Sequence, residues 1–95
     1  MIKSVNVLGH KVRIKYISSW SGHKEAHEKL VGRFYPDTGT IYILKTLSKD
    51  IQQQFLLHEI NHAIMFYTGI DQNISSDLEE VIAQSFASFY KGFLK

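Results

Sequence analysis

The feature that most constrains the fold is one long apolar segment that contains two histidines. The segment extends from about Lys49 to Tyr67, and its histidines, His58 and His62, are four residues apart. Ser48 precedes it and Gly69 follows it, and these residue types are preferred at the start and at the end of helices. We therefore predict one helix here, with both imidazoles on one face and one turn apart.

Helical phase predicts that this helix is buried on nearly all sides. At about 100° per residue, the stripe that carries the two histidines also carries Ile51, Phe55 and Phe66. The opposite side is apolar and consists of Leu56, Leu57, Ile60, Ala63, Ile64 and Tyr67. Only Gln54 and Asn61 form an obviously solvated strip. Histidines buried among apolar side chains need a partner, and a metal ion is the natural one.

The five residues from His58 to His62, HEINH, have the HExxH spacing. Both imidazoles can reach one Zn²⁺ ion at the ~2.0–2.1 Å that zinc requires. Glu59 follows the first histidine and lies beside the metal, where it could take a proton from a zinc-bound water and pass it to a leaving amine. The spacing therefore predicts His58 and His62 as zinc ligands and Glu59 as the catalytic residue. The alternative is a pair of core histidines bonded to the backbone, with a solvated Glu59.

A second helix is predicted from Ser76 to about Phe93. Ser76 and Glu79 have the spacing of a capping box, in which the glutamate carboxylate folds back onto the backbone N–H of the serine. The core stripe of this helix is expected to contain Leu78, Ile82, Ser85, Phe86, Phe89 and Phe93.

A catalytic zinc ion usually has three protein ligands, so a third must come from outside the first helix. The capping box would occupy Glu79 and leave Glu80 free. The face of Glu80 also carries the small residues Ala83 and Ala87, which would allow two helices to approach closely. We therefore predict Glu80 as the third ligand, with Glu79 as an alternative; both could instead be surface charges favoured near a helix N-terminus. A histidine is a further alternative, the candidates being His10, His23 and His27.

The residues before the first helix predict strands. Apolar and polar residues alternate on both sides of Gly9-His10 and again across Val31–Leu44, whose turn is Pro36–Gly39, so we predict two hairpins. The charged segment His23–Leu30 is expected to be a short helix or an ordered loop with solvated histidines. The predicted class is α+β: a small three- to four-stranded sheet, antiparallel or mixed, packed on both helices in one domain, residues 1–95. Thr40–Leu44 could be a sheet edge that pairs with an extended peptide, or a purely structural strand.

Composition limits the partners and the compartment. The chain has no cysteine, which excludes disulfides, thiolate zinc sites and cysteine nucleophiles. Its net charge is +2 and its basic residues are scattered, so a nucleic-acid partner is not indicated. No apolar run approaches the ~18 residues of a membrane span, and the start lacks the apolar core of a signal peptide. We expect a cytoplasmic protein without a membrane partner; its oligomeric state is not predicted.

HEINH, taken together with the segment Glu80–Ala87 (EVIAQSFA), resembles the gluzincin pattern, in which HExxH is followed by a helix with ExxA-x-x-FA or a close relative. In thermolysin-like enzymes and in ImmA/IrrE-type metallo-endopeptidases, the first glutamate of the second segment binds zinc, which implies Glu80 here. The short form, with a sheet before the HExxH helix and one helix after it, resembles small phage- and prophage-encoded metallopeptidases. One departure is Gln84, where thermolysin-like enzymes have an acidic residue beside a ligand. An amide accepts a hydrogen bond from an imidazole but cannot raise its basicity as a carboxylate does.

The resemblance implies a zinc-dependent peptidase domain with a minimal zincin-like fold. We expect an endopeptidase rather than an exopeptidase, acting on a peptide or protein substrate, in the host cytoplasm if the chain is phage-encoded. A tyrosine could stabilise the oxyanion of the reaction, the candidates being Tyr35, Tyr42, Tyr67 and Tyr90. The alternative function is a non-catalytic module, stabilised by zinc, that sequesters a host or phage protein.

Overall fold

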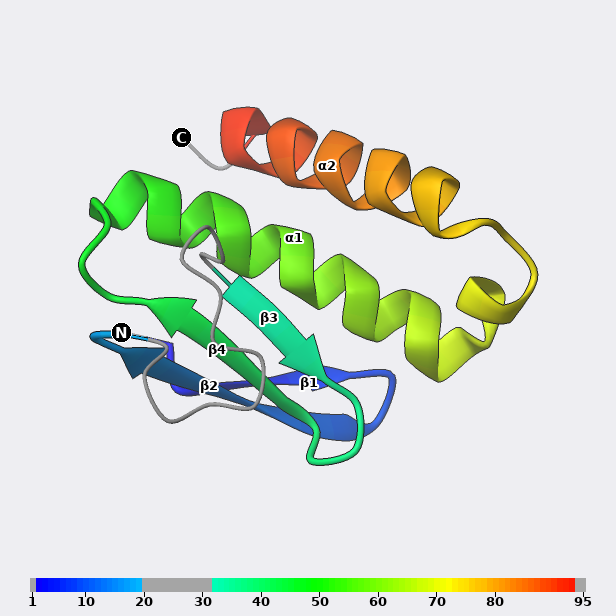
Figure 1. Cartoon of the computed structure of the whole chain (residues 1–95), viewed down its shortest axis with the longest axis horizontal. Coiled ribbons are helices and arrows are strands. Elements are labelled where there is room, and N and C mark those ends of the chain that lie inside the picture. Colours follow the sequence, from blue (N-terminus) through cyan, green and yellow to red (C-terminus); the bar gives the residue numbers. More distant parts are fainter. Residues whose placement is uncertain (1, 20–31, 94–95) are drawn as a thin grey trace.

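Strands are followed by helices along the chain in the computed structural model, which describes residues 2–19 and 32–93, with residues 89–93 described by their backbone alone. In chain order the elements are β1 (Ser4–Val7), β2 (His10–Ile17), β3 (Gly32–Tyr35), β4 (Thr40–Leu44), α1 (Lys49–Thr68), the short 3-10 helix η1 (Ile70–Gln72) and α2 (Ser76–Phe93) (Figure 1). The predicted α+β class is confirmed. The segment His23–Leu30, with both of its histidines, lies outside the described residues.

The strands form one mixed sheet in the order β1-β2-β4-β3. β1 and β2 form the first predicted hairpin. Its turn consists of Leu8 and Gly9, which both have a positive φ, 53° and 86°. A two-residue turn needs positive φ angles at both positions if it is to match the twist of the strands. β3 and β4 form the second predicted hairpin. β2 pairs in parallel with β4, on the side of β4 that β3 leaves open. The interpretation of Thr40–Leu44 as an edge is therefore wrong, and β3 is an edge strand instead.

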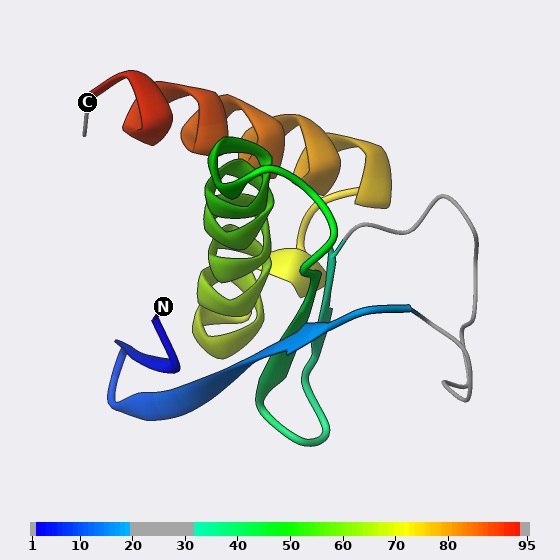
Figure 2. The same ribbon diagram turned by 90° about the vertical axis from the view of Figure 1, so that its left-hand side faces the viewer.

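The sheet and the two helices lie in layers. Figures 1 and 2 show α1 across one face of the sheet, and α2 on the side of α1 away from the sheet, where it runs in the opposite general direction and crosses α1 obliquely. Among the described elements, α1 contacts β1, β3 and β4, whereas α2 packs chiefly on α1. The core between the sheet and α1 consists of Val7, Val12, Ile14, Phe34, Ile41, Ile43, Leu56 and Ala63. Because α1 is covered on two sides, polar side chains on it can be buried.

The ends of α1 agree with the prediction to within one residue. The Ser48 hydroxyl accepts a backbone hydrogen bond from the first turn at 3.3 Å, and Gly69 ends the helix in the left-handed region at a φ of 80°. The predicted exposure is wrong for Asn61, which is buried and donates to the backbone carbonyl one turn earlier at 3.2 Å. It is also wrong for Ile64, which is exposed, because the sheet and α2 leave a third side of α1 in contact with solvent. Within the described part of the chain, no helix is both long and apolar enough to cross a membrane.

α2 begins with a cap different from the predicted one. Ser75 Oγ accepts a hydrogen bond from Leu78 N at 3.1 Å, so Ser75 and not Ser76 is the N-cap residue. The predicted capping box between Ser76 and Glu79 is therefore wrong, because Ser76 already lies inside the helix. The Glu79 carboxylate contacts His62 of α1 instead.

Small side chains form the buried face of α2. Ala83 and Ala87 are both 0% exposed, whereas Leu78 and Phe86, which we expected in the core stripe, are 46% and 45% exposed. Ser85 is exposed as well. The predicted core stripe is therefore wrong for Leu78, Ser85 and Phe86, whereas Ile82 is half-buried and the side chains of Phe89 and Phe93 lie outside the described ones. The predicted close approach of two helices through Ala83 and Ala87 is confirmed, because α2 packs chiefly on α1 through these residues.

Enlarging the alanine face should destabilise the fold. We expect Ala83→Leu to lower the free energy of unfolding by about 2 kcal/mol, because a larger side chain at a fully buried helix contact forces α1 and α2 apart. Urea unfolding followed by circular dichroism measures the change. Ser88→Leu, at an exposed position of the same helix, is the matched control and should change stability by less than about 0.5 kcal/mol. Equal effects at the two positions would contradict the packing described here.

Candidate metal centre

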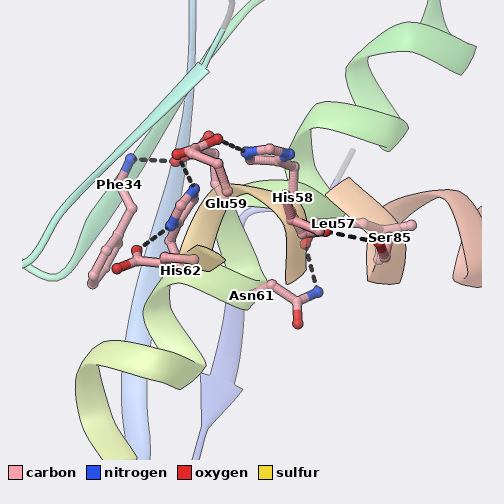
Figure 3. A network of polar contacts seen from close by, with 10 residues as sticks. Phe34, Leu57, His58, Glu59, Asn61, His62 and Ser85 are labelled. Carbon is pink, nitrogen blue, oxygen red and sulfur yellow. Dashed lines mark hydrogen bonds and ion pairs between the residues drawn. The ribbon is translucent and has the colours of Figure 1, made fainter. Parts of the chain in front are cut away.

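A carboxylate from α2 meets two histidines from α1. The rings of His58 and His62 lie side by side, with their centroids 4.9 Å apart (Figure 3). The Glu80 carboxylate reaches both rings: its Oε2 is 3.1 Å from His58 Nε2, and its Oε1 is 3.0 Å from His62 Nε2. The packing of α2 on α1 thus brings together the three residues that the sequence predicted as ligands.

Glu79 contacts the other ring nitrogen of the second histidine. Its Oε2 is 2.5 Å from His62 Nδ1, and its side chain is 23% exposed, compared with 62% for Glu80. An ionised carboxylate only accepts hydrogen bonds, so His62 Nδ1 donates to Glu79. A neutral His62 then has a lone pair on Nε2, and this lone pair faces an oxygen of Glu80. Two acceptors that face each other need a cation between them, either a proton or a metal ion.

Two imidazoles and a carboxylate are donors of the kind that can hold a metal ion such as zinc. Ligand atoms at ~2.0–2.1 Å from zinc in a tetrahedron are about 3.3 Å apart. The contacts of Glu80 with the imidazoles, at 3.1 and 3.0 Å, are close to that spacing. Among the described residues, one ligand atom each of His58, Glu59 and His62 also lie within 4.8 Å of one another. Either carboxylate could therefore complete a set of three with the histidines.

Glu59 is turned from α1 towards the edge strand β3. Its Oε1 accepts a hydrogen bond from Phe34 N at 2.8 Å, and the residue is 8% exposed (Figure 3). Burial raises the pKa of the Glu59 carboxyl, and Glu80 adds to this, whereas the two imidazoles and the Phe34 N–H act in the opposite direction. A carboxyl with a raised pKa beside an imidazole pair is suited to accepting and releasing protons.

Gly32, at the start of β3, lies close to Ile43 of β4 and to Glu59 of α1. A methyl group on Gly32 would lie 3.0 Å from Ile43 Cδ1, 3.4 Å from Tyr42 O and 3.6 Å from Glu59 Cγ. Ile43 is fully buried and has little space to move. A methyl group on Gly32 would therefore crowd the Ile43 side chain, whereas its distance from Glu59 Cγ is that of an ordinary van der Waals contact.

A cavity of about 550 Å³ opens over these residues. β3 and the turn after it, α1, η1 and the first half of α2 all contribute to its lining. Aromatic side chains lie beside the polar cluster, namely Phe34, Phe55 and Phe66. A cavity with this mixture of apolar and polar groups can accept a segment of peptide.

The other candidates from the sequence contribute less to this cavity. His10 stacks on Tyr67, with ring centroids 4.0 Å apart, and does not line the cavity. No tyrosine whose side chain is described lines it either, and the side chain of Tyr90 is outside that description. Gln84 does line the cavity, but the group at His62 Nδ1 is Glu79.

Sequence reasoning missed the contact between Glu79 and His62. It assigned the Glu79 carboxylate to a capping box with Ser76, and the capping residue is one position earlier. The signal was available, because Ser75 is also a serine and capping by it directs Glu79 towards α1. Asp71, which follows the end of α1 and lines the cavity, was missed as well.

Comparison with known proteins finds no matching family, no matching curated protein and no matching solved structure. The chemistry that this site can perform is set by its donor atoms, two imidazoles and the carboxylates around them.

Proposed function

We propose that this chain is a zinc-dependent peptidase in which His58, His62 and Glu80 bind Zn²⁺. The observation that most supports this is the position of the Glu80 carboxylate, 3.1 and 3.0 Å from the two Nε2 atoms. Glu80 is preferred to Glu59 as the third ligand because Glu59 is already engaged with Phe34 N. The HExxH spacing, and the resemblance to gluzincins and ImmA/IrrE-type endopeptidases, support the same assignment.

The residues around the site have separate roles in this proposal. A bound zinc ion supplies Lewis acidity, which acidifies water and polarises a peptide carbonyl. Glu59 accepts a proton from the attacking water and donates it to the leaving nitrogen. Its Oε1 is held by the Phe34 N–H, which leaves Oε2 for the proton. Glu79 holds His62 in the tautomer with an unprotonated Nε2, as a metal ligand requires.

The cavity favours a peptide or protein substrate. Its lining includes exposed residues from separate elements, Arg33 of β3 and Gln84 of α2. An open site of this kind suits an endopeptidase, which has to accept the middle of a chain. The resemblance to small phage- and prophage-encoded metallopeptidases supports a phage or prophage origin and action in the host cytoplasm, a compartment with which the absence of cysteine agrees.

Metal content and cleavage test the proposal together. Purified protein should contain stoichiometric zinc, cleave a mixed peptide library, lose this activity to a chelator and regain it when zinc is added. Because zinc binds the folded chain, free zinc at about 1,000 times Kd should stabilise the fold by about 4 kcal/mol, which thermal unfolding with and without chelator measures. Zinc without cleavage would support the second candidate below, and protein without any metal affinity would contradict both.

A second candidate is a zinc-stabilised binding module that sequesters a host or phage protein without cleaving it. The hydrogen bond from Phe34 N to Glu59 favours this second function. It connects β3 to α1 through a buried carboxylate, which gives Glu59 a structural role that does not depend on catalysis. In such a module Glu59→Gln would leave function unchanged, since glutamine keeps an acceptor for Phe34 N. In the peptidase the same substitution abolishes cleavage.

A further inference from the structure

Charged residues are segregated between the two layers of the fold. Among the described residues, the part of the chain up to Ser48 contains six basic residues and one acidic residue, Asp37. From Lys49 onward the described part contains two basic and six acidic residues. None of the four described strands contains an aspartate or a glutamate. The net charge of +2 therefore conceals a basic sheet and an acidic helical layer.

Three of the basic residues, Lys11, Arg13 and Lys15, alternate with core residues along β2. Val12 and Ile14, which lie between them, are 0% and 5% exposed and belong to the core beneath α1. Successive side chains of a strand point to opposite faces, so the three cations lie on the face away from both helices (Figure 2). All three are exposed, and none of them has an ion pair in the described part of the chain. We call these three residues the basic face.

β1 places hydrogen-bonding side chains beside the basic face. Asn6 is the partner of Lys11 in the register of the two strands, and Ser4 is the partner of Arg13. Both side chains are exposed. Asn6 Oδ1 accepts a hydrogen bond from Gly9 N at 2.9 Å, which leaves the NH₂ group of its amide as a donor. Amides and hydroxyls beside lysine and arginine are the groups that proteins use to contact phosphate oxygens.

We propose that the basic face binds the phosphates of a single-stranded nucleic acid that lies along β2. Cations two residues apart on a strand are separated by about 7 Å, which suits the regularly spaced phosphates of an extended strand. A duplex fits less well, because β2 is an internal strand of the sheet β1-β2-β4-β3. Four strands span about 14 Å, which is wider than the major groove of about 12 Å. A single strand, by contrast, can lie flat on a four-stranded sheet.

The other polyanions that a basic surface can attract are favoured less by this face. The large apolar residues that are exposed in the described part of the chain all lie outside the strands. Protein interfaces depend on apolar and aromatic anchors, and peripheral membrane binding is strengthened by apolar side chains that enter the lipid. An acidic peptide cannot add as a strand to β2, because β1 and β4 already pair with its two edges. Nucleic-acid binding, in contrast, derives much of its affinity from charge alone.

Fluorescence anisotropy with labelled oligonucleotides tests the proposal. The probes are oligomers of deoxythymidine and of uridine, each about 15 nucleotides long, which covers the usual site sizes. Both should bind, because the contacts are made to phosphates that DNA and RNA share. Each neutralised phosphate of a single strand contributes about −0.7 to the slope of log K against log salt, so three cations predict a slope of about −2. Affinity should therefore fall about twentyfold between about 50 and about 200 mM salt.

Variants of β2 identify the residues responsible. Each of Lys11→Gln, Arg13→Gln and Lys15→Gln should make the salt slope shallower by about 0.7, and the triple variant should lose detectable binding. Arg13→Lys keeps the charge and should keep the slope. Lys49→Gln makes the same change of charge at an exposed position of α1 and is the matched control, with binding unchanged. Thermal unfolding verifies that each variant is folded.

The outcomes separate this inference from the proposed peptidase function, on which it does not depend. Absence of oligonucleotide binding at about 50 mM salt, or a slope that the triple variant retains, would overturn it. Equal or tighter binding of a DNA duplex of the same length, of polyglutamate or of phosphatidylserine vesicles would overturn it as well. The measurements use neither zinc nor cleavage, so a chain that binds the oligonucleotides through β2 but cleaves no peptide would support the basic face and contradict the peptidase.

Discussion

Replacing Glu59 by glutamine should reduce peptide cleavage by about a thousandfold while leaving zinc binding and the fold intact. Glutamine has the shape of glutamate, and its side-chain oxygen can still accept the hydrogen bond from Phe34 N. Its amide, however, cannot take a proton from water. The substitution therefore separates proton transfer by Glu59 from the tie that the same side chain makes between α1 and β3.

Three measurements on the Glu59→Gln protein are needed. Initial rates on the peptide library give the loss of activity, elemental analysis gives the zinc content, and thermal unfolding gives the stability. Gln53→Glu, the reverse change at an exposed position of the same helix, is the control and should cleave at the original rate. Full activity of the glutamine variant would exclude Glu59 as the proton carrier.

Glu80→Gln should weaken zinc binding by more than about a hundredfold, and Glu79→Gln by about tenfold to a hundredfold. The larger effect is expected at Glu80 because its carboxylate lies 3.1 and 3.0 Å from the two Nε2 atoms that face the metal position. Glu79 acts only through His62, whose Nδ1 proton it accepts in a hydrogen bond. Without that hydrogen bond, His62 is still present as a ligand, but its tautomer is no longer fixed.

Competition with a chromophoric chelator measures both affinities on the same scale. The two variants are matched controls for each other, since they make one chemical change at consecutive positions of α2. Zinc lost from Glu79→Gln and retained by Glu80→Gln would reverse the assignment of the third ligand. Equal retention in both would instead favour the set of His58, Glu59 and His62, which α1 supplies alone.

Features set by local signals could be predicted from the sequence. α1 begins and ends where Ser48 and Gly69 indicated, and the second hairpin turns at Pro36–Gly39. The order of the strands could not be predicted in this way, because the parallel pairing of β2 with β4 depends on contacts between distant segments. Periodicity failed on α2 for a related reason. It identifies which side chains share a face but not which face another element covers; that face was indicated by the small residues Ala83 and Ala87, which α1 covers.

Local signals in the sequence also account for only part of the candidate site. His58, Glu59 and His62 follow from spacing on one helix, and the small residues on the face of Glu80 indicated that this carboxylate would approach them. A capping position displaced by one residue was enough to hide the contact of Glu79 with His62. Asp71 gave no signal at all, because only the turn after Gly69 brings η1 to the cavity.

The position of β3 at the edge of the sheet has a consequence for self-association. An edge strand offers unpaired backbone groups on which a second chain can add a strand, and such addition is a common route to aggregation. On β3 the N–H of Phe34 is already bonded to Glu59 of the same molecule. Another copy of the chain cannot extend the sheet at that point without displacing a buried carboxylate. The side chain that we propose as the proton carrier thus also occupies a backbone donor through which a second chain could pair with this edge.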